Sequence, residues 1–201
     1  HRHEVDIVIG TQLVTKGHDF PEVTLVGVIL SDLSLNIPDF RASERTFQLL
    51  TQVAGRAGRG HKPGEVLIQT HNPRHHSLLC AKEHDTMQFR KFELEQRQQL
   101  RMPPFHSLTM VVCSSPHEER AESLIREIAE KILVISSKKS VSQTLKLSEK
   151  AKQFDTVQVI GPIEAPMKKL RNRFRWQLLL KANDVRPLLC LLIQIFETPP
   201  L

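Results

Sequence analysis

The chain has 201 residues, of which 40% are hydrophobic and 25% are charged, and its formal net charge is +6. This composition is typical of a globular protein, and the length suits one large domain or two small ones. The sequence contains no run of about 18 apolar residues, which argues against a membrane-spanning helix. The chain begins with His1 rather than methionine and lacks a signal-peptide pattern, so we expect a fragment of a longer protein.

The cysteines and histidines do not form a metal-binding pattern. Cys80, Cys113 and Cys190 are odd in number and far apart, which argues against a disulfide framework and a Cys-x-x-Cys zinc site. We therefore expect a cytoplasmic protein with no metal site in this chain. Four histidines could suggest a metal site, but they lack further ligands at a suitable spacing. We predict that they are solvated on helix surfaces: His75, His76, His84 and His117.

The basic charge is concentrated in one region. Residues 138–175 contain ten basic and three acidic side chains, a net +7, whereas the rest of the chain sums to about −1. A polyanion is therefore the expected partner of this region. We interpret the lysine- and serine-rich stretch 138–152 as a solvated linker, and the cluster at 168–175 as the candidate for binding.

The first 74 residues show the pattern of an α/β domain. Val5–Ile9 and Val23–Leu30 are short runs rich in β-branched residues, which predicts buried strands of a mainly parallel sheet. Apolar residues then recur at helical spacing over Arg41–Ala54, with Asp39 as a start signal, and a third strand is predicted at Glu65–Thr70. Because too few strands are present to complete such a sheet, we expect the others upstream.

A second unit is predicted to follow one or two connecting helices over residues 75–102. This unit, residues 103–201, reads as a small α+β domain of order β-α-β-β-α, and its helix start has a capping signal in Ser115, Pro116 and Glu118. The expected elements are a strand at Phe105–Cys113, a helix at Pro116–Ile135, strands at Asp155–Ile160 and Phe174–Lys181, and a helix at Asp184–Phe196.

The clearest chemical signal is the segment Gln52–Gly60, QVAGRAGRG, in which Arg56 and Arg59 each follow a glycine. Glycine lets the backbone approach a ligand closely, and arginine offers a permanently charged fork that suits phosphate oxygens. Two such arginines at a helix end can clamp a triphosphate, and an arginine of this kind accelerates phosphoryl transfer about 10³- to 10⁵-fold. The alternative is an arginine-capped helix end that leads into a glycine-rich loop.

The motifs resemble those of a known family. Gln-x-x-Gly-Arg-x-Gly-Arg resembles the sixth motif of superfamily 2 helicases, and Gly10–Pro21, GTQLVTKGHDFP, resembles their fifth. Lys16–Val26 and Asp39–Arg45 are similar to the PriA family of primosomal replication-restart DNA helicases. Met102–Phe105 and Gly161–Lys181 are similar to the C-terminal domain of that family, so the resemblance covers nearly the whole chain.

The resemblance implies a motor of two RecA-like lobes that hydrolyses ATP at their interface and moves 3′ to 5′ on DNA. This chain would supply the C-terminal part of the second lobe. The resemblance implies that Arg59 is the arginine finger, that Arg56 contacts phosphate or the coupling network, and that Gln52 senses the γ-phosphate. Gly17 and Asp19 would couple the nucleotide site to DNA. Contacts with the DNA strand backbone are implied for Thr11, Gln12 and Lys16, the last of which is alternatively a solvated lysine.

Several features of the family are absent from this sequence. It lacks the Gly-x-x-x-x-Gly-Lys-Thr phosphate loop, the Asp-Glu-x-His segment for magnesium and the paired cysteines that bind zinc. We therefore expect the chain alone to hold only a half-site for ATP with Mg²⁺, to bind no zinc and to be inactive in ATP hydrolysis. Glu164 stands where the family has proline, Phe174 replaces a tyrosine, and a final strand is absent or divergent at Leu201.

DNA contacts are predicted for a cluster of cations with an aromatic neighbour: Lys168, Lys169, Arg171, Arg173, Arg175 and Trp176. Cations follow a phosphate backbone, and aromatic faces stack on bases at roughly 1–3 kcal/mol per base. In a strand, Arg173 and Arg175 share one face with Gln177, whereas Phe174 and Trp176 share the other. Trp176 is therefore either a core residue or a stacking platform.

The resemblance also implies the partners. Forked and single-stranded DNA are the expected ligands, and the acidic tail of single-stranded-DNA-binding protein is a rival for the same charge. Primosome loading proteins are also expected partners. The protein itself is expected to be a monomer. Two alternatives remain: another superfamily 2 member such as an RNA helicase, which should lack the Met102–Phe105 and Gly161–Lys181 segments, or a nucleic-acid- or protein-binding module without the motor.

Overall fold

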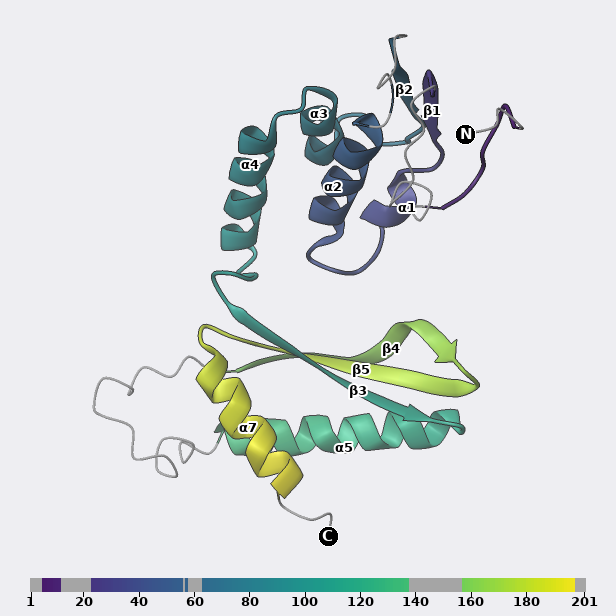
Figure 1. The fold of residues 1–201 in the computed structure, drawn as a ribbon. Helices are drawn as coiled ribbons and strands as arrows, with labels where there is room; N and C mark the ends of the chain where they lie inside the picture. The colour runs from purple at the N-terminus through teal and green to yellow at the C-terminus, as the bar shows by residue number, and fades with distance from the viewer. Residues whose placement is uncertain (1–4, 12–22, 56, 58–62, 138–156, 198–201) are drawn as a thin grey trace. The chain divides into compact units, whose positions relative to one another are not determined.

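The computed structural model describes residues 5–11, 23–55, 57, 63–137 and 157–197 (Figure 1). The chain divides into two compact units, His1–Gln96 and Arg97–Leu201. The division lies within helix α4 (Thr86–Gln99), and each unit has a hydrophobic core of its own. The expected domain boundaries at residues 74/75 and 102/103 stay a prediction.

The first unit combines a parallel pair of strands with helices. Its other elements in chain order are β1 (Leu25–Val28), α1 (Asp32–Leu35), α2 (Ala42–Ala54), β2 (Glu65–Ile68) and α3 (His76–Lys82). β1 and β2 pair in parallel, as the sequence predicts, with Val26 opposite Val66. Apolar residues on one side of α2 meet α3 and α4, and the rings of Phe47 and Phe89 stack with their centroids 4.0 Å apart.

One expectation for the first unit is wrong, and one of its elements was not predicted. Val5–Ile9 form no strand, and the side chains of Val5, Ile7, Val8 and Ile9 are exposed. A strand needs a neighbour for its hydrogen bonds, and β1 and β2 pair only with each other in the described part of the chain. The structure also adds the short helix α1, where the Asp32 carboxylate accepts hydrogen bonds from the His71 amide and the Thr70 hydroxyl, both at 2.8 Å.

In its described residues, the second unit has the predicted order β-α-β-β-α. Its elements are β3 (Ser107–Ser115), α5 (Glu118–Ser137), β4 (Gln158–Leu170), β5 (Arg173–Ala182) and α7 (Val185–Glu197). The strands form an antiparallel sheet of order β3-β5-β4, and α5 and α7 cover one of its faces (Figure 1). The core between helices and sheet includes Ile125, Ile132, Leu178, Leu180 and Leu188.

Strand β4 is longer than the sequence predicts. It continues through Gly161-Pro162 to Leu170, with register shifts between Ile160 and Ile163 and between Glu164 and Lys169. Proline lacks a donor for the ladder, but β4 is an edge strand, where such a residue and a bulge are tolerated. Gly161 has φ +106°, which a residue with a Cβ rarely adopts.

The start of α5 differs from the predicted capping box. Ser115 does accept a hydrogen bond from the His117 amide, at 3.1 Å, but the helix begins at Glu118 rather than Pro116. Because Ser115 is the last residue of β3, its own backbone belongs to the sheet. The Glu118 carboxylate contacts Lys168 instead.

Candidate nucleic-acid interface

The hairpin of β4 and β5 carries the predicted cation cluster. Its turn has two residues, Arg171 and Asn172, with φ of +50° and +60°, and Leu170 pairs with Arg173 across it. Two residues with positive φ form the tight turn that matches the twist of a hairpin, and asparagine is well suited to it. The turn therefore places Arg171 at the tip of the hairpin, between the two strands that carry the other cations.

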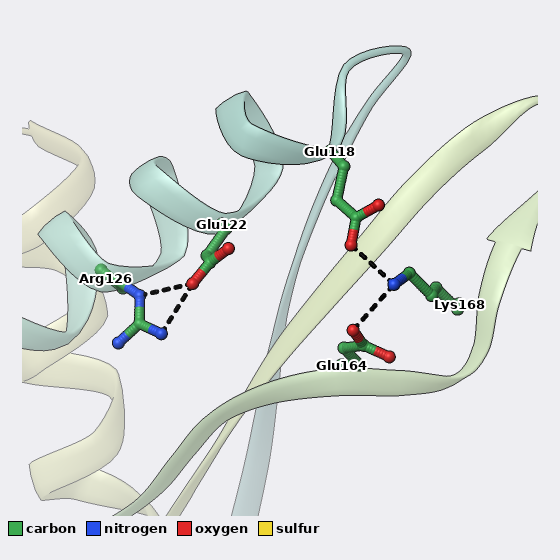
Figure 2. A network of polar contacts seen from close by, with 5 residues as sticks. All are labelled: Glu118, Glu122, Arg126, Glu164 and Lys168. Carbon is green, nitrogen blue, oxygen red and sulfur yellow. Dashed lines mark hydrogen bonds and ion pairs between the residues drawn. The ribbon is translucent and has the colours of Figure 1, made fainter.

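Lys168 is held by two carboxylates (Figure 2). Its Nζ lies 2.6 Å from Oε1 of Glu118 and 2.9 Å from Oε1 of Glu164. The hydrogen bonds with Glu118 and Glu164 raise the pKa of the Lys168 ammonium. Four residues of a regular strand span about 13 Å, so Glu164 and Lys168 meet only because the strand bulges between them. This contact was not predicted from the sequence.

Lys169 and Arg173 have neutral partners. Lys169 pairs with Phe174 in the register, and its Nζ lies 4.7 Å from the centre of that ring. Arg173 donates from Nη2 to the Ser114 carbonyl oxygen at 2.7 Å and from Nε to the Ser114 hydroxyl at 3.3 Å. Arg175 lies opposite Ser114 in the register of β3 and β5. These contacts orient the side chains but leave their positive charge uncompensated.

Trp176 packs against the core of the second unit. The guanidinium of Arg126 lies 5.9 Å from its ring centre, and Arg126 is itself paired with Glu122 at 2.7 Å (Figure 2). The indole Nε1 is buried and has no hydrogen-bond partner among the described residues. These contacts favour the core role of Trp176, and its stacking on a base stays a prediction.

The nucleotide-site residues are mostly outside the described part of the chain. Gln52 lies in the last turn of α2 and is partly buried, and Thr11 is exposed. The helix ends at Ala54, just before the Gly55 of the motif. The remaining predicted residues of this group lie outside the described residues: Gln12, Lys16, Gly17, Asp19, Arg56 and Arg59. Their implied roles stay predictions.

A buried polar pair was missed in the sequence. The predicted solvation is wrong for His75 and His76: the His76 side chain is 14% exposed, and its Nε2 lies 3.2 Å from Oε2 of Glu93, which is 10% exposed. His84 and His117 are exposed, as predicted. A signal was present, because Glu93 lies four residues after the buried Phe89 and so on the same face of α4.

The described residues do not fit a zinc site. No three His, Cys, Asp or Glu side chains in the described part of the chain come together as ligands would. Cys80 and Cys113 are buried in the separate cores of the two units, and burial raises the pKa of both thiols. None of the helices in the described ranges is long and apolar enough to cross a membrane.

Comparisons with known proteins identify the family of this chain. Residues 98–196 match the family model of the primosomal protein N C-terminal domain. The chain is 43% identical over 194 residues to the replication restart protein PriA of Bacillus subtilis, which covers 96% of this chain and 22% of that protein. It is 41% identical to the PriA proteins of Synechocystis and Rickettsia conorii, over 90% of this chain and 20% and 25% of theirs.

The chain thus spans only about a fifth to a quarter of the length of these relatives. The domain-model match spans Met102–Phe105 and Gly161–Lys181, the segments that resemble the C-terminal domain of this family. The chain belongs to the PriA family of replication restart proteins and corresponds to its C-terminal portion.

Proposed function

We propose that this chain is the C-terminal portion of an ATP-dependent 3′–5′ DNA helicase that assembles the primosome at stalled or repaired forks. In this proposal the second unit binds forked and single-stranded DNA through the β4–β5 hairpin. The observation that carries the proposal is the concentration of cations at that hairpin. Four of them have no carboxylate partner among the described residues: Lys169, Arg171, Arg173 and Arg175.

The first unit would complete the ATP site of the motor from one side. Arg59 would stabilise the charge that develops on the transferred phosphoryl group, with Arg56 and Gln52 as further contacts on the phosphate side. Gly17 and Asp19 would link this site to the DNA strand, which Thr11, Gln12 and Lys16 would contact. The phosphate loop and the magnesium ligands would come from sequence outside this chain, as would the zinc ligands.

The hairpin suits DNA because a guanidinium recognises phosphate oxygens without reading the base sequence. Each phosphate neutralised by a cation releases condensed counterions, so the logarithm of the binding constant falls with log salt by about 0.9 per contact. A protein surface that contacts the DNA backbone can recognise a fork by its shape. We also propose two kinds of protein partner for this chain. One is single-stranded-DNA-binding protein, through its acidic tail, and the other is the primosome loading proteins.

Fluorescence anisotropy of the 201-residue chain on a labelled DNA fork tests the proposal. The variant Arg171→Gln, Arg173→Gln, Arg175→Gln should lower the salt slope by roughly 2–3 and weaken binding. A matched control removes three exposed cations from α3 and α4 through Lys82→Gln, Arg90→Gln and Lys91→Gln, and it should bind as the native chain does. Equal losses in the two variants, or no binding by the native chain, would contradict the proposal.

A further inference from the structure

The two faces of the β4–β5 hairpin carry different side chains. Leu178 and Leu180 of β5 are fully buried in the core beneath the helices, and Trp176 packs against the same core. Since successive residues of a strand point to opposite faces, Arg173 and Arg175 point to the open face, away from α5 and α7.

The partner of Arg173 supports this orientation. Ser114 lies between Cys113 and Ser115 in β3, and both of these neighbours are buried. Ser114 is exposed and therefore points to the open face, where its hydroxyl and carbonyl oxygens accept hydrogen bonds from Arg173. On the open face, Arg173 is thus oriented by the neutral oxygen atoms of Ser114.

The carboxylates near the hairpin lie on the helix-covered side (Figure 2). Glu164 pairs with Trp176 in the register and is the only acidic residue in β3, β4 and β5 as the structure describes them. Glu118 and Glu122 come from the first turns of α5, which packs against that side. A polyanion approaching from the helices would therefore meet three carboxylates.

Two cations on the helix-covered side, Lys168 and Arg126, are already compensated by carboxylates, whereas Lys169 contacts the neutral ring of Phe174. Glu118 and Glu164 hold Lys168, and Glu122 holds Arg126 through two hydrogen bonds of 2.9 and 2.7 Å. These pairs are partly exposed, so each contributes little to stability. Their effect on a ligand is nevertheless direct, because a lysine between two carboxylates has no net charge to offer a phosphate.

The open face has the opposite character. Arg173 and Arg175 lie on it and Arg171 lies at the turn, and within the described ranges no ion pair joins any of the three to a carboxylate. The hydrogen bonds that Arg173 donates to Ser114 fix the arginine fork before a ligand arrives, which reduces the entropy lost on binding.

We infer that DNA lies against the open face of this sheet, on Arg171, Arg173 and Arg175, and that the carboxylates exclude phosphate from the helix-covered side. Lys168 is then a positioning residue, which ties the hairpin to α5. The inference rests on the proposed function, because it takes the hairpin as the DNA-binding element and adds which of its sides is used.

Two double variants of equal net charge test the inference in the 201-residue chain by anisotropy on fork DNA. Arg173→Gln with Arg175→Gln should weaken binding about 10- to 100-fold at 0.1 M salt and lower the salt slope by roughly 2. Lys168→Gln with Lys169→Gln should change the dissociation constant less than about 3-fold and leave the slope unchanged. Circular dichroism establishes that both variants are folded.

Removal of the carboxylates provides a second arm, which does not depend on the lysine variants being folded. Glu118→Gln with Glu164→Gln releases Lys168 and should tighten DNA binding more than Glu127→Gln with Glu130→Gln, which removes two carboxylates elsewhere on α5 and releases Lys131. Equal tightening by the two pairs would overturn the inference.

The outcomes separate the inference from the proposed function. If the lysine and arginine pairs weaken binding equally, both sides of the hairpin contact DNA, so the inference is wrong and the proposed function stands. If neither pair matters although the native chain binds, the hairpin is not the binding element and the inference falls with it. If the native chain binds no fork DNA, the proposed function itself fails.

Discussion

Replacing His75 by alanine should destabilise the first unit, because this imidazole caps α3. Nδ1 of His75 accepts a hydrogen bond from the Ser77 amide at 3.3 Å and lies 2.8 Å from the Ser77 hydroxyl. Ser77 is fully buried, so its hydroxyl has no access to water as a substitute. His75→Asn keeps a side-chain acceptor at the cap and serves as the matched control.

The expected cost follows from these contacts. Loss of an N-cap acceptor costs about 0.5–2 kcal/mol, and a buried polar group left without a partner costs about 1–3 kcal/mol. The two contributions overlap, so we expect the free energy of unfolding to fall by about 1–3 kcal/mol in His75→Ala. For a unit of this size, Tm should fall by roughly 5–15 °C.

The same cap should be sensitive to pH. Burial, followed by the neighbouring charge of His76, lowers the pKa of His75 from its ordinary value of 6.5. The unfolded chain therefore takes up this proton before the folded chain does as the pH falls. The stabilisation is present above about pH 6.5 and is lost as the pH falls through 6.5 toward the lower pKa of the folded state. His75→Asn should lack this part of the pH dependence.

Urea unfolding at pH 8, 6.5 and 5.5, followed by circular dichroism, measures both effects. Trp176 is the only tryptophan and lies in the second unit, so the midpoint of its fluorescence transition should not change in either variant. The reasoning would be refuted if His75→Asn were as unstable as His75→Ala at pH 8, or if it kept the native dependence on pH.

Four further expectations concern other parts of the chain. Leu178→Ala leaves a cavity in the second core and should cost about 2–4 kcal/mol in a fluorescence-detected urea transition, whereas Leu189→Ala, at an exposed site, should cost less than 1. Gly161→Ala should lower Tm at a cost of about 1–3 kcal/mol, because its Cβ would lie 3.1 Å from the Gln177 carbonyl oxygen at a φ of +106°. The hydrogen bond from the His71 amide holds the pKa of Asp32 below 3.8, so its stabilisation is lost as the pH falls through that lowered value, and acid unfolding of Asp32→Asn should lack this component. Phosphate release from ATP with Mg²⁺ by the chain alone should stay at background.

The order of elements in the second unit could be predicted because each element is encoded locally. The apolar spacing of α5 and the alternation in β5 are visible within a single stretch of sequence, and both elements form within two residues of their predicted starts. The arginine and glycine motif at Gln52–Gly60 is likewise contained in one short stretch, which is why its resemblance to a helicase motif is visible in the sequence alone.

Local pattern was insufficient where another strand decided the outcome. Val5–Ile9 has the composition of a strand but does not pair with either strand of the first unit. Gly161-Pro162 has the composition of a break, yet β4 continues through it because β5 supplies a partner on one side and the strand is at the edge of the sheet. Propensity describes one segment, whereas a strand is a property of a pair.

By itself, the sequence determined the family, the element order of the second unit and the place where basic charge gathers. The tertiary structure decided which of those charges remain uncompensated. Lys168 meets Glu118 fifty residues away, and Arg173 meets Ser114 fifty-nine residues away. Such contacts depend on strand register and on which face the helices cover, and both are set by packing of the whole unit rather than by neighbours along the chain.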